Sequence, residues 1–382
     1  MSRVTVVGGG LAGLVAAVEC AERGLRVEVL EAKSRLGGRA WTTEGSWKAN
    51  YGAHAVYTGG GLWDWLAVRG LHTGFGRGKS SGIRFRWRGV SRRTPPATVV
   101  RGVASLRHDA PVDEDFRSWM TRHAGPEAAA ALTSMAGVLT FDHDPGRLSA
   151  AFVAQRIRRI LLHPRPITRY PPGGWATMIH SITMRARELG VTIATSAPVD
   201  SLAPGPHIVA VEPEAARKLL GVEFPSLGTR AAFLDVGLGG SPRSDAFVVS
   251  DLDDAAFAER FSAVDRTVAP PDHALLQAFV GLRPGEDLHG GVARLEGLLD
   301  AVWPRWRSRE RWRRRAAVTE STGALDLPGT TWRDRPPVEH APDVWLCGDW
   351  VAAPGHLSEV SVHSAVRAAI GVARAARGAA AL

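Results

Sequence analysis

The chain has 382 residues, of which 45% are hydrophobic and 22% charged, the balance of an ordinary soluble globular protein. This length exceeds one minimal domain, so we expect two lobes with a sizeable core. The only cysteines, Cys20 and Cys347, are far apart and form no C-x-x-C pattern, and His and Cys nowhere cluster at ligand spacing. These observations exclude a disulfide scaffold and a metal site, and they favour a reducing, cytoplasmic compartment.

The formal net charge of +9 comes from arginine, because only four of the 47 basic residues are lysines. The arginines are scattered along the chain, which argues against a specific nucleic-acid partner. Residues 305–315 are the exception, with seven arginines interleaved with Trp306 and Trp312. This run is either a solvated helix face or a peripheral contact with an anionic membrane surface.

The first predicted elements form a βαβ beginning. A β-branched run predicts a buried strand over residues 3–7, and the Ala-rich stretch 11–23 predicts a helix capped by Gly24. A second strand over residues 27–30 ends at Glu31. The apolar start could also pass for a signal peptide, but its glycines favour a phosphate-binding turn.

The next 100 residues are turn-rich and helical, and later the β-rich segments return. We expect helices over 113–122 and 148–162, then strands over 191–194 and 207–211. A last strand over 344–347 precedes a small-residue helix over 358–376. The chain therefore leaves the first lobe and re-enters it.

The spacing Gly8-x-Gly10-x-x-Gly13, between a strand and a helix, predicts a dinucleotide site. The first glycine permits the tight turn, the second lets the backbone approach a pyrophosphate, and the third lets the helix pack on its strand. Glu31 stands at the distance expected for an acid that binds the adenosine ribose, and it would repel the 2′-phosphate of NADP.

The stretch from Glu31 to Arg39 ends in R-x-G-G-R, and it resembles the superfamily of FAD-dependent amine oxidases, phytoene desaturases and protoporphyrinogen oxidases. The resemblance implies that Arg39 reaches the diphosphate, as its guanidinium fork suits. The segment 50–55, Pro172-Gly-Gly174 and the segment 346–359 resemble later motifs of this superfamily, most closely its phytoene desaturase-like branch. The residues expected to contact the cofactor are Gly8, Gly10, Leu11, Ala12, Gly13, Glu31, Ala32, Arg39, Gly52, Ala53, His54, Val199, Gly348, Asp349, Leu357 and Ser358.

The sequence also departs from the superfamily pattern. Amine-oxidising members place an aromatic residue where this chain has Leu357, and they use a lysine in the substrate lobe, where this chain has none beyond Lys218. His54 is interpreted as either an acid or base beside the flavin or a packing residue. No catalytic residue is singled out.

We therefore predict an α/β fold with a discontinuous Rossmann-type FAD-binding domain (1–75, 166–228 and 335–382) and an inserted α+β substrate domain (76–165 and 229–334). The predicted function is oxidation or dehydrogenation of an apolar or conjugated small molecule by hydride transfer to flavin N5. A flavin-binding protein that catalyses a non-redox isomerisation is the alternative. Amine oxidation and a nicotinamide-dependent dehydrogenase are weaker alternatives.

Overall fold

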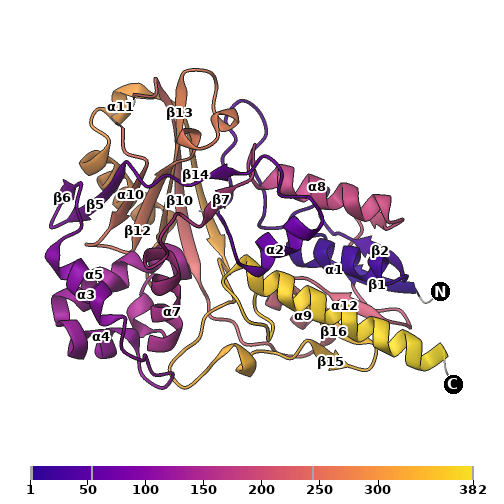
Figure 1. Cartoon of the computed structure of the whole chain (residues 1–382). Helices are drawn as coiled ribbons and strands as arrows, with labels where there is room; N and C mark the ends of the chain where they lie inside the picture. The colour runs from indigo at the N-terminus through magenta and orange to yellow at the C-terminus, as the bar shows by residue number, and fades with distance from the viewer. Residues whose placement is uncertain (1–2, 53–54, 243–244, 381–382) are drawn as a thin grey trace.

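The computed structural model describes residues 3–52, 55–242 and 245–380. Two main sheets lie side by side, with long helices against the sheet that contains the N-terminal strand and a group of shorter helices beside the other (Figure 1). The two ends of the chain lie on the same side of the molecule (Figure 1).

The first sheet is the Rossmann-type sheet. Its neighbouring strands are parallel except for the pair at one edge, β15 and β16. In spatial order the strands are β15 (Glu339–Ala341), β16 (Val344–Leu346), β9 (His207–Val209), β1 (Arg3–Val7), β2 (Arg26–Leu30) and β8 (Thr192–Ala194). Three distant parts of the chain thus build one sheet, which confirms the predicted discontinuous α/β fold.

Helices cover this sheet. The helix after the glycine-rich turn is buried along its whole middle, from Ala12 to Cys20, because it packs between the sheet and two further helices. The helices of this lobe are α1 (Leu11–Glu22), α2 (Gly61–Val68), α8 (Trp175–Glu188), α9 (Pro213–Leu220) and α12 (Ser358–Ala380). The Ala-rich and Gly-rich composition of α1 permits this close packing.

The second sheet has seven strands and is antiparallel except for the pair β11 and β5. Alternate residues of β10 and β13 face α10 (Leu288–Val302), and the residues between them face the first lobe. In spatial order the strands are β14 (Glu310–Thr319), β10 (Arg230–Gly239), β13 (His273–Gly281), β12 (Ala256–Arg260), β11 (Val248–Asp251), β5 (Ile83–Trp87) and β6 (Val90–Arg92).

Smaller elements complete the fold. A three-stranded sheet bridges the lobes, with β7 (Thr168–Tyr170) between β3 (Val56–Tyr57) and β4 (Gly76–Arg77). The helices beside the second sheet are α3 (Ala97–Ser105), α4 (Phe116–Ala124), α5 (Pro126–Met135), α6 (Gly137–Thr140) and α7 (Ala150–Leu161). Short helical turns occur at α11 (Trp306–Arg309), Pro145–Arg147, Phe261–Ala263, Arg266–Val268 and Trp332–Asp334.

The arginine-rich run 305–315 corrects one expectation. A solvated helix face was one interpretation of this run, but only Trp306–Arg309 is helical and residues 310–315 belong to β14, because they pair with β10. Several of its arginines form ion pairs, such as Arg309 with Asp245 and Arg313 with Glu296. Peripheral membrane contact through 305–315 stays a prediction. Among the described residues, no helix combines the length and the apolar character needed to span a bilayer.

Candidate dinucleotide-binding site

The glycine-rich turn is held by close backbone packing. The N–H of Gly8 donates to the carbonyl of Leu30 at 2.8 Å, and its φ of +105° is a conformation that favours glycine. A Cβ on Gly13 would lie only 1.9 Å from the carbonyl oxygen of Gly8. Gly8 and Gly13 are therefore required by the fold itself.

Gly10 differs from its neighbours. A Cβ built on Gly10 meets nothing within 4 Å, and its φ of −75° suits any residue. Gly10 precedes α1, where Leu11 and Ala12 follow, and no side chain caps this helix. The open space and the uncapped N–H groups of the first turn together form a place for an anionic group.

Glu31 follows β2 and closes the other side of the turn. Its side chain is buried. Its two carboxylate oxygens accept hydrogen bonds from the N–H groups of Gly9 at 2.7 Å and Lys33 at 2.8 Å. Ala32 next to it is exposed. The carbonyl of Glu31 accepts the N–H of Ala197, which brings the loop that carries the half-buried Val199 to this end of the site.

Arg39 and Asp349, which are far apart in the sequence, form an ion pair in the site. Nη2 of Arg39 lies 2.6 Å from Oδ1 of Asp349, whose other oxygen accepts the N–H of Gly323 at 3.1 Å. Burial raises the pKa of Asp349, but the charge and hydrogen bond of Arg39 outweigh burial and lower it below its usual value. Arg39 is an exposed residue, with 45% of its side chain accessible, and its Nη1 donates to the backbone carbonyls of Glu320 at 2.8 Å and Ser321 at 3.1 Å. The pair therefore fixes a guanidinium that still has an accessible side.

The loop before α12 connects the dinucleotide side of the site with the second sheet. The buried Gly348 donates its N–H to Oγ of Ser364 at 3.0 Å, and Ser358 begins the helix. Leu357 has a φ of +47°, a left-handed conformation that is rare for a branched side chain. Its side chain packs against a cluster of phenylalanines.

The phenylalanines of this cluster contact one another, and the contacts extend to Tyr51. Ring centroids lie 4.6 Å apart for Phe141 and Phe279, 5.7 Å for Phe233 and Phe279, and 6.3 Å for Tyr51 and Phe233. Gly52 is buried between them, since a Cβ there would contact Phe141 at 3.4 Å and Phe233 at 3.5 Å. Ala53 and His54 lie outside the described residues. Tyr51 and Gly52, from the segment 50–55 that resembles the superfamily, thus lie beside a cluster of buried aromatic rings.

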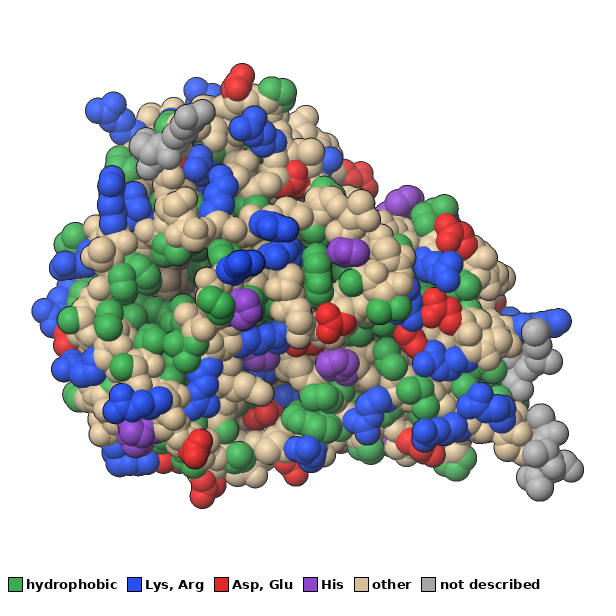
Figure 2. All heavy atoms as spheres, viewed as in Figure 1, with side chains coloured by type: hydrophobic (Ala, Val, Ile, Leu, Met, Phe, Trp, Pro, Cys, Tyr) green, Lys and Arg blue, Asp and Glu red, His purple; other side chains and the backbone are tan. Residues whose placement is uncertain are grey.

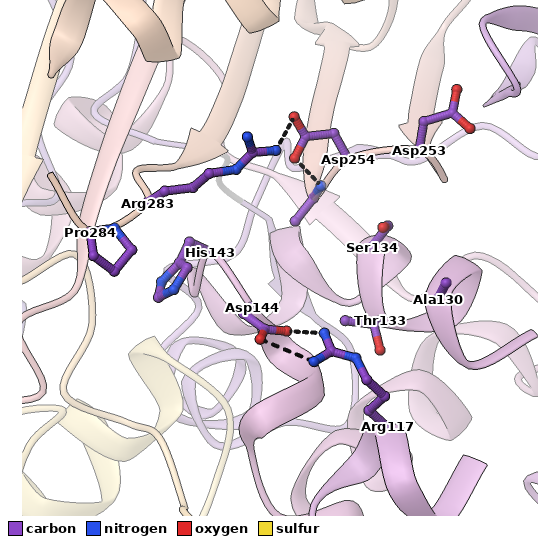
Figure 3. Close-up of a pocket in the computed structure, with 11 residues that line it drawn as sticks. Arg117, Ala130, Thr133, Ser134, His143, Asp144, Asp253, Asp254, Arg283 and Pro284 are labelled. Atoms are coloured by element: carbon purple, nitrogen blue, oxygen red, sulfur yellow. Dashed lines mark hydrogen bonds and ion pairs between the residues drawn. The ribbon is translucent and has the colours of Figure 1, made fainter. Parts of the chain in front are cut away.

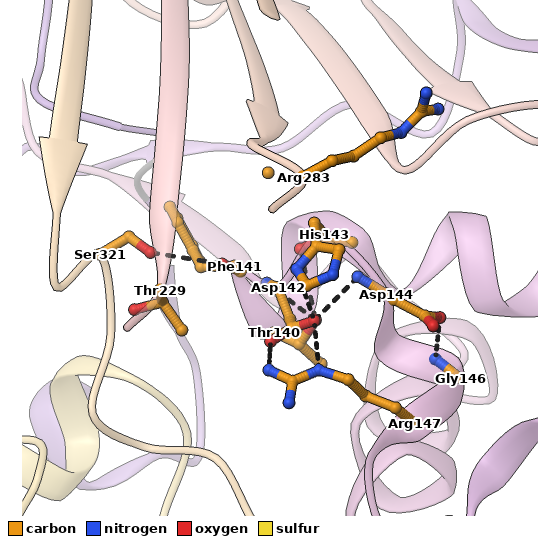
Figure 4. A network of polar contacts seen from close by, with 12 residues as sticks. Thr140, Phe141, Asp142, His143, Asp144, Gly146, Arg147, Thr229, Arg283 and Ser321 are labelled. Carbon is orange, nitrogen blue, oxygen red and sulfur yellow. Dashed lines mark hydrogen bonds and ion pairs between the residues drawn. The ribbon is translucent and has the colours of Figure 1, made fainter. Parts of the chain in front are cut away.

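Phe141 is fixed in this surface by polar contacts on both sides (Figure 4). Its φ of +55° is left-handed, and its carbonyl accepts Oγ of Ser321 at 3.3 Å. The next residue, Asp142, is buried and binds Arg147 at 2.6 Å and the N–H of Asp144 at 2.8 Å. The sequence interpretation recognised only a turn here, since nothing local in the sequence shows which side chain the turn presents.

A row of polar side chains crosses the second sheet beside the aromatic rings. Arg314, Asp235, Gln277 and Glu259 occupy adjacent strands in register. Asp235 accepts hydrogen bonds from Nε of Arg314 at 2.6 Å and from Nε2 of Gln277 at 2.8 Å. Gln277 also donates to the backbone carbonyl of Asn50 at 3.1 Å. This network holds the segment before Gly52 against the sheet.

Glu259 at the end of this row gives a pH-dependent prediction. The residue is buried, and Oε1 has no hydrogen-bond partner among the described residues. Burial raises the pKa of Glu259 to about 8, although a hydrogen bond with Tyr170 opposes this rise. Between about pH 4.5 and 8 the unfolded chain releases a proton that the folded protein keeps, so this group lowers the free energy of unfolding as pH rises.

We expect Glu259→Gln to raise the melting temperature relative to the unmodified protein, by an amount that grows from about pH 4.5 to about pH 8 and then levels off. Thermal unfolding followed by circular dichroism across this range measures the difference. Two parallel stability curves would show that Glu259 is ionised in the folded protein at neutral pH.

A buried ion pair joins the two lobes beside the start of α12. Arg159 of α7 binds both carboxylate oxygens of Glu359, at 2.8 and 2.7 Å. Glu359 also accepts the N–H of His356 at 3.0 Å, and Arg156 donates to the carbonyl of Gly355 at 3.3 Å. Burial, with the charges of Arg156 and Arg159, lowers the pKa of His356 to about 2, so this histidine is neutral. The sequence interpretation missed the pair because its partners are 200 residues apart.

Comparison with known proteins agrees with this geometry. Residues 6–67 match the family profile of the NAD(P)-binding Rossmann-like domain. Nicotine dehydrogenase from Pseudomonas putida is 44% identical over 63 residues, which are 16% of this chain and 12% of that enzyme. The aligned part thus spans only about an eighth of the dehydrogenase.

Solved structures are similar over nearly the whole chain. Cyclohexylamine oxidase from Brevibacterium oxydans is 17% identical, with a TM-score of 0.74, and the match covers 98% of this chain and 99% of that one. A reduced UDP-galactopyranose mutase is 17% identical, with a TM-score of 0.72 over 97% and 95% of the two chains. The chain therefore has a two-lobed fold whose N-terminal part matches a Rossmann-like domain. Its fold is that of the FAD-dependent amine oxidase type, as the sequence resemblance predicted.

Proposed function

We propose that the chain is a flavin-dependent oxidoreductase that binds FAD. The observation that carries this proposal is the ion pair of the partly accessible Arg39 with the buried Asp349, which joins two motifs that lie far apart in the sequence. The open space at Gly10 and the uncapped start of α1 suit a diphosphate, and the carboxylate of Glu31 suits a ribose. When bound, FAD supplies a hydride acceptor at its N5 atom.

We propose further that the substrate is apolar or conjugated. The run of Tyr51, Phe141, Phe233 and Phe279 lies against Leu357 and Gly52, where the resemblance places the flavin. An apolar substrate beside this buried cluster would be held chiefly by burial of its own apolar area, at about 25 cal/mol per Å². The residues of the chain would then orient a C–H bond and exclude water. Neither task needs a general base.

The test is a panel of compounds mixed anaerobically with purified protein, after an absorption spectrum has shown non-covalently bound FAD. We expect polyene, terpenoid or aromatic candidates to bleach the flavin faster than primary amines, amino acids or polyamines do. Faster bleaching by any amine would contradict the proposed substrate class. Colourless protein that takes up NAD but not FAD would contradict the proposed cofactor.

A non-redox isomerisation is the second candidate, because a UDP-galactopyranose mutase shares this fold. The same anaerobic experiment separates the two candidates. A net oxidation bleaches the flavin in proportion to the product formed, whereas a net isomerisation forms product with no lasting change in the flavin spectrum.

A further inference from the structure

A surface cleft lies on the second lobe, at the end of the molecule that carries β5 and β6. It has a volume of about 600 Å³, within the range of small-ligand sites. Its lining residues are Ser80, Ser81, Gly82, Ile83, Arg84, Phe85, Arg93, Pro95 and Asp245. The cleft starts directly after Lys79, in the sequence Gly78-Lys-Ser-Ser-Gly82.

The cations of this cleft lack carboxylate partners. Among the described residues, Arg84 donates only to the carbonyl of Ile83, and neither Arg93 nor Lys79 has an ion pair. The one carboxylate in the lining, Asp245, exposes 9% of its side chain and is already bound by Arg309 at 2.8 and 3.2 Å. The cleft therefore has an uncompensated positive charge.

Arg260 adds a buried cation behind the cleft. Within the part of the chain that the structure describes, its guanidinium donates only to neutral oxygens, those of Ser241, Pro242 and the backbone carbonyl of Asp245, and Nε has no partner. Burial and the charge of Arg309 lower the pKa of Arg260, while burial, Arg260 and Arg266 lower that of Lys79. Like charges thus crowd here without the acid partners that most arginines of this chain have.

The positive charge also extends over the surrounding surface. Figure 2 shows Lys and Arg side chains gathered over the part of the molecule that carries β5, β6 and α11. Another pocket of about 390 Å³ differs, because both of its arginines are paired with carboxylates (Figure 3). There Arg117 binds Asp144 at 2.5 Å and Arg283 binds Asp254 at 3.3 Å.

We propose that the cleft at Ser80–Arg84 and Arg93 binds a free small molecule that carries a phosphate or diphosphate group. Guanidinium groups form paired hydrogen bonds with phosphate oxygens, and the hydroxyls of Ser80 and Ser81 add further donors. Two or more unpaired cations favour a multiply charged anion over a carboxylate. The cleft is separate from the Gly10 turn, so this inference does not rest on the proposed function.

The test is calorimetric titration with inorganic pyrophosphate at low ionic strength. It uses full-length protein that has been loaded with FAD and freed of excess FAD by gel filtration, so that the Gly10 turn is already occupied. Loss of a charge-assisted hydrogen bond weakens binding about tenfold, so we expect Arg84→Gln and Arg93→Gln each to have this effect. The double variant should lose measurable binding. Arg88→Gln is the matched control, because Arg88 lies in the turn between β5 and β6 but pairs with Glu127 outside the cleft.

Three outcomes would overturn the proposal. The first is no binding of pyrophosphate. The second is equal affinity in the double variant and the unmodified protein at an unchanged melting temperature. The third is binding to vesicles of equimolar phosphatidylcholine and phosphatidylglycerol without binding to pyrophosphate, since the anion would then be a lipid headgroup.

Discussion

Valine in place of Gly10 is expected to weaken FAD binding about 100-fold, equivalent to ~2.8 kcal/mol, while the protein stays folded. The structure leaves open space at the Cβ position of Gly10, and the backbone there suits any residue. The added Cβ therefore meets no protein atom, and the side chain would occupy the space proposed for the diphosphate. The ratio of flavin to protein absorbance after gel filtration, together with the melting temperature of the apoprotein, measures both effects.

Gly13→Ala is the matched control for this variant. Its Cβ would lie 1.9 Å from the carbonyl oxygen of Gly8, so it should destabilise the apoprotein itself. Full flavin occupancy in Gly10→Val would show that the glycine-rich turn has only a structural role. A lowered melting temperature in Gly10→Val apoprotein would contradict the open space at Gly10.

Removal of the Arg159 charge has the largest expected effect on stability. Arg159→Gln leaves the carboxylate of Glu359 buried without a cation, which costs about 3 kcal/mol for a buried pair. The carboxylate has little room to move toward water, because Gly60 packs directly against it. Denaturation by urea, with the slope of the transition unchanged, gives the loss in free energy of unfolding.

Two further variants complete this experiment. Arg159→Gln with Glu359→Gln should recover part of the loss, because no buried charge then lacks a partner. Arg217→Gln breaks an exposed pair with Glu214 and should leave the free energy of unfolding nearly unchanged, because water screens this pair. Equal losses in Arg159→Gln and Arg217→Gln would contradict a structural role for the buried pair.

The cofactor side of the site was predictable because its residues are local in sequence. Gly8, Gly10, Gly13 and Glu31 belong to one βαβ unit, and the spacing that predicts them is a property of a single turn. Arg39 and Asp349 lie apart, yet each has a motif around it, and the structure joins them at 2.6 Å. The contact of each predicted residue with a cofactor stays a prediction.

The substrate side was not predictable in this way. Phe141, Phe233 and Phe279 come from a turn and two strands, and they meet only because β10 and β13 pair in one register. Alternation in 231–239 indicates that Phe233 and Asp235 share a face, but it does not show what that face meets. The strand in place of a helix at 310–319 has the same cause, since pairing with β10 decides its conformation.

The position of β16 and α12 has a consequence for synthesis of the protein. The neighbours of β9 in the first sheet are β1, from the start of the chain, and β16, from its last tenth, and α12 packs against α1. A nascent chain on the ribosome therefore holds the apolar faces of β9 and α1 exposed until about nine-tenths of the polypeptide has been made. Contacts between segments that are distant in sequence form slowly, and until they form, apolar surface is exposed to other chains. The soluble yield of recombinant protein should therefore rise when synthesis is slowed or chaperones are co-expressed. A C-terminal truncation that removes α12 should yield aggregated protein.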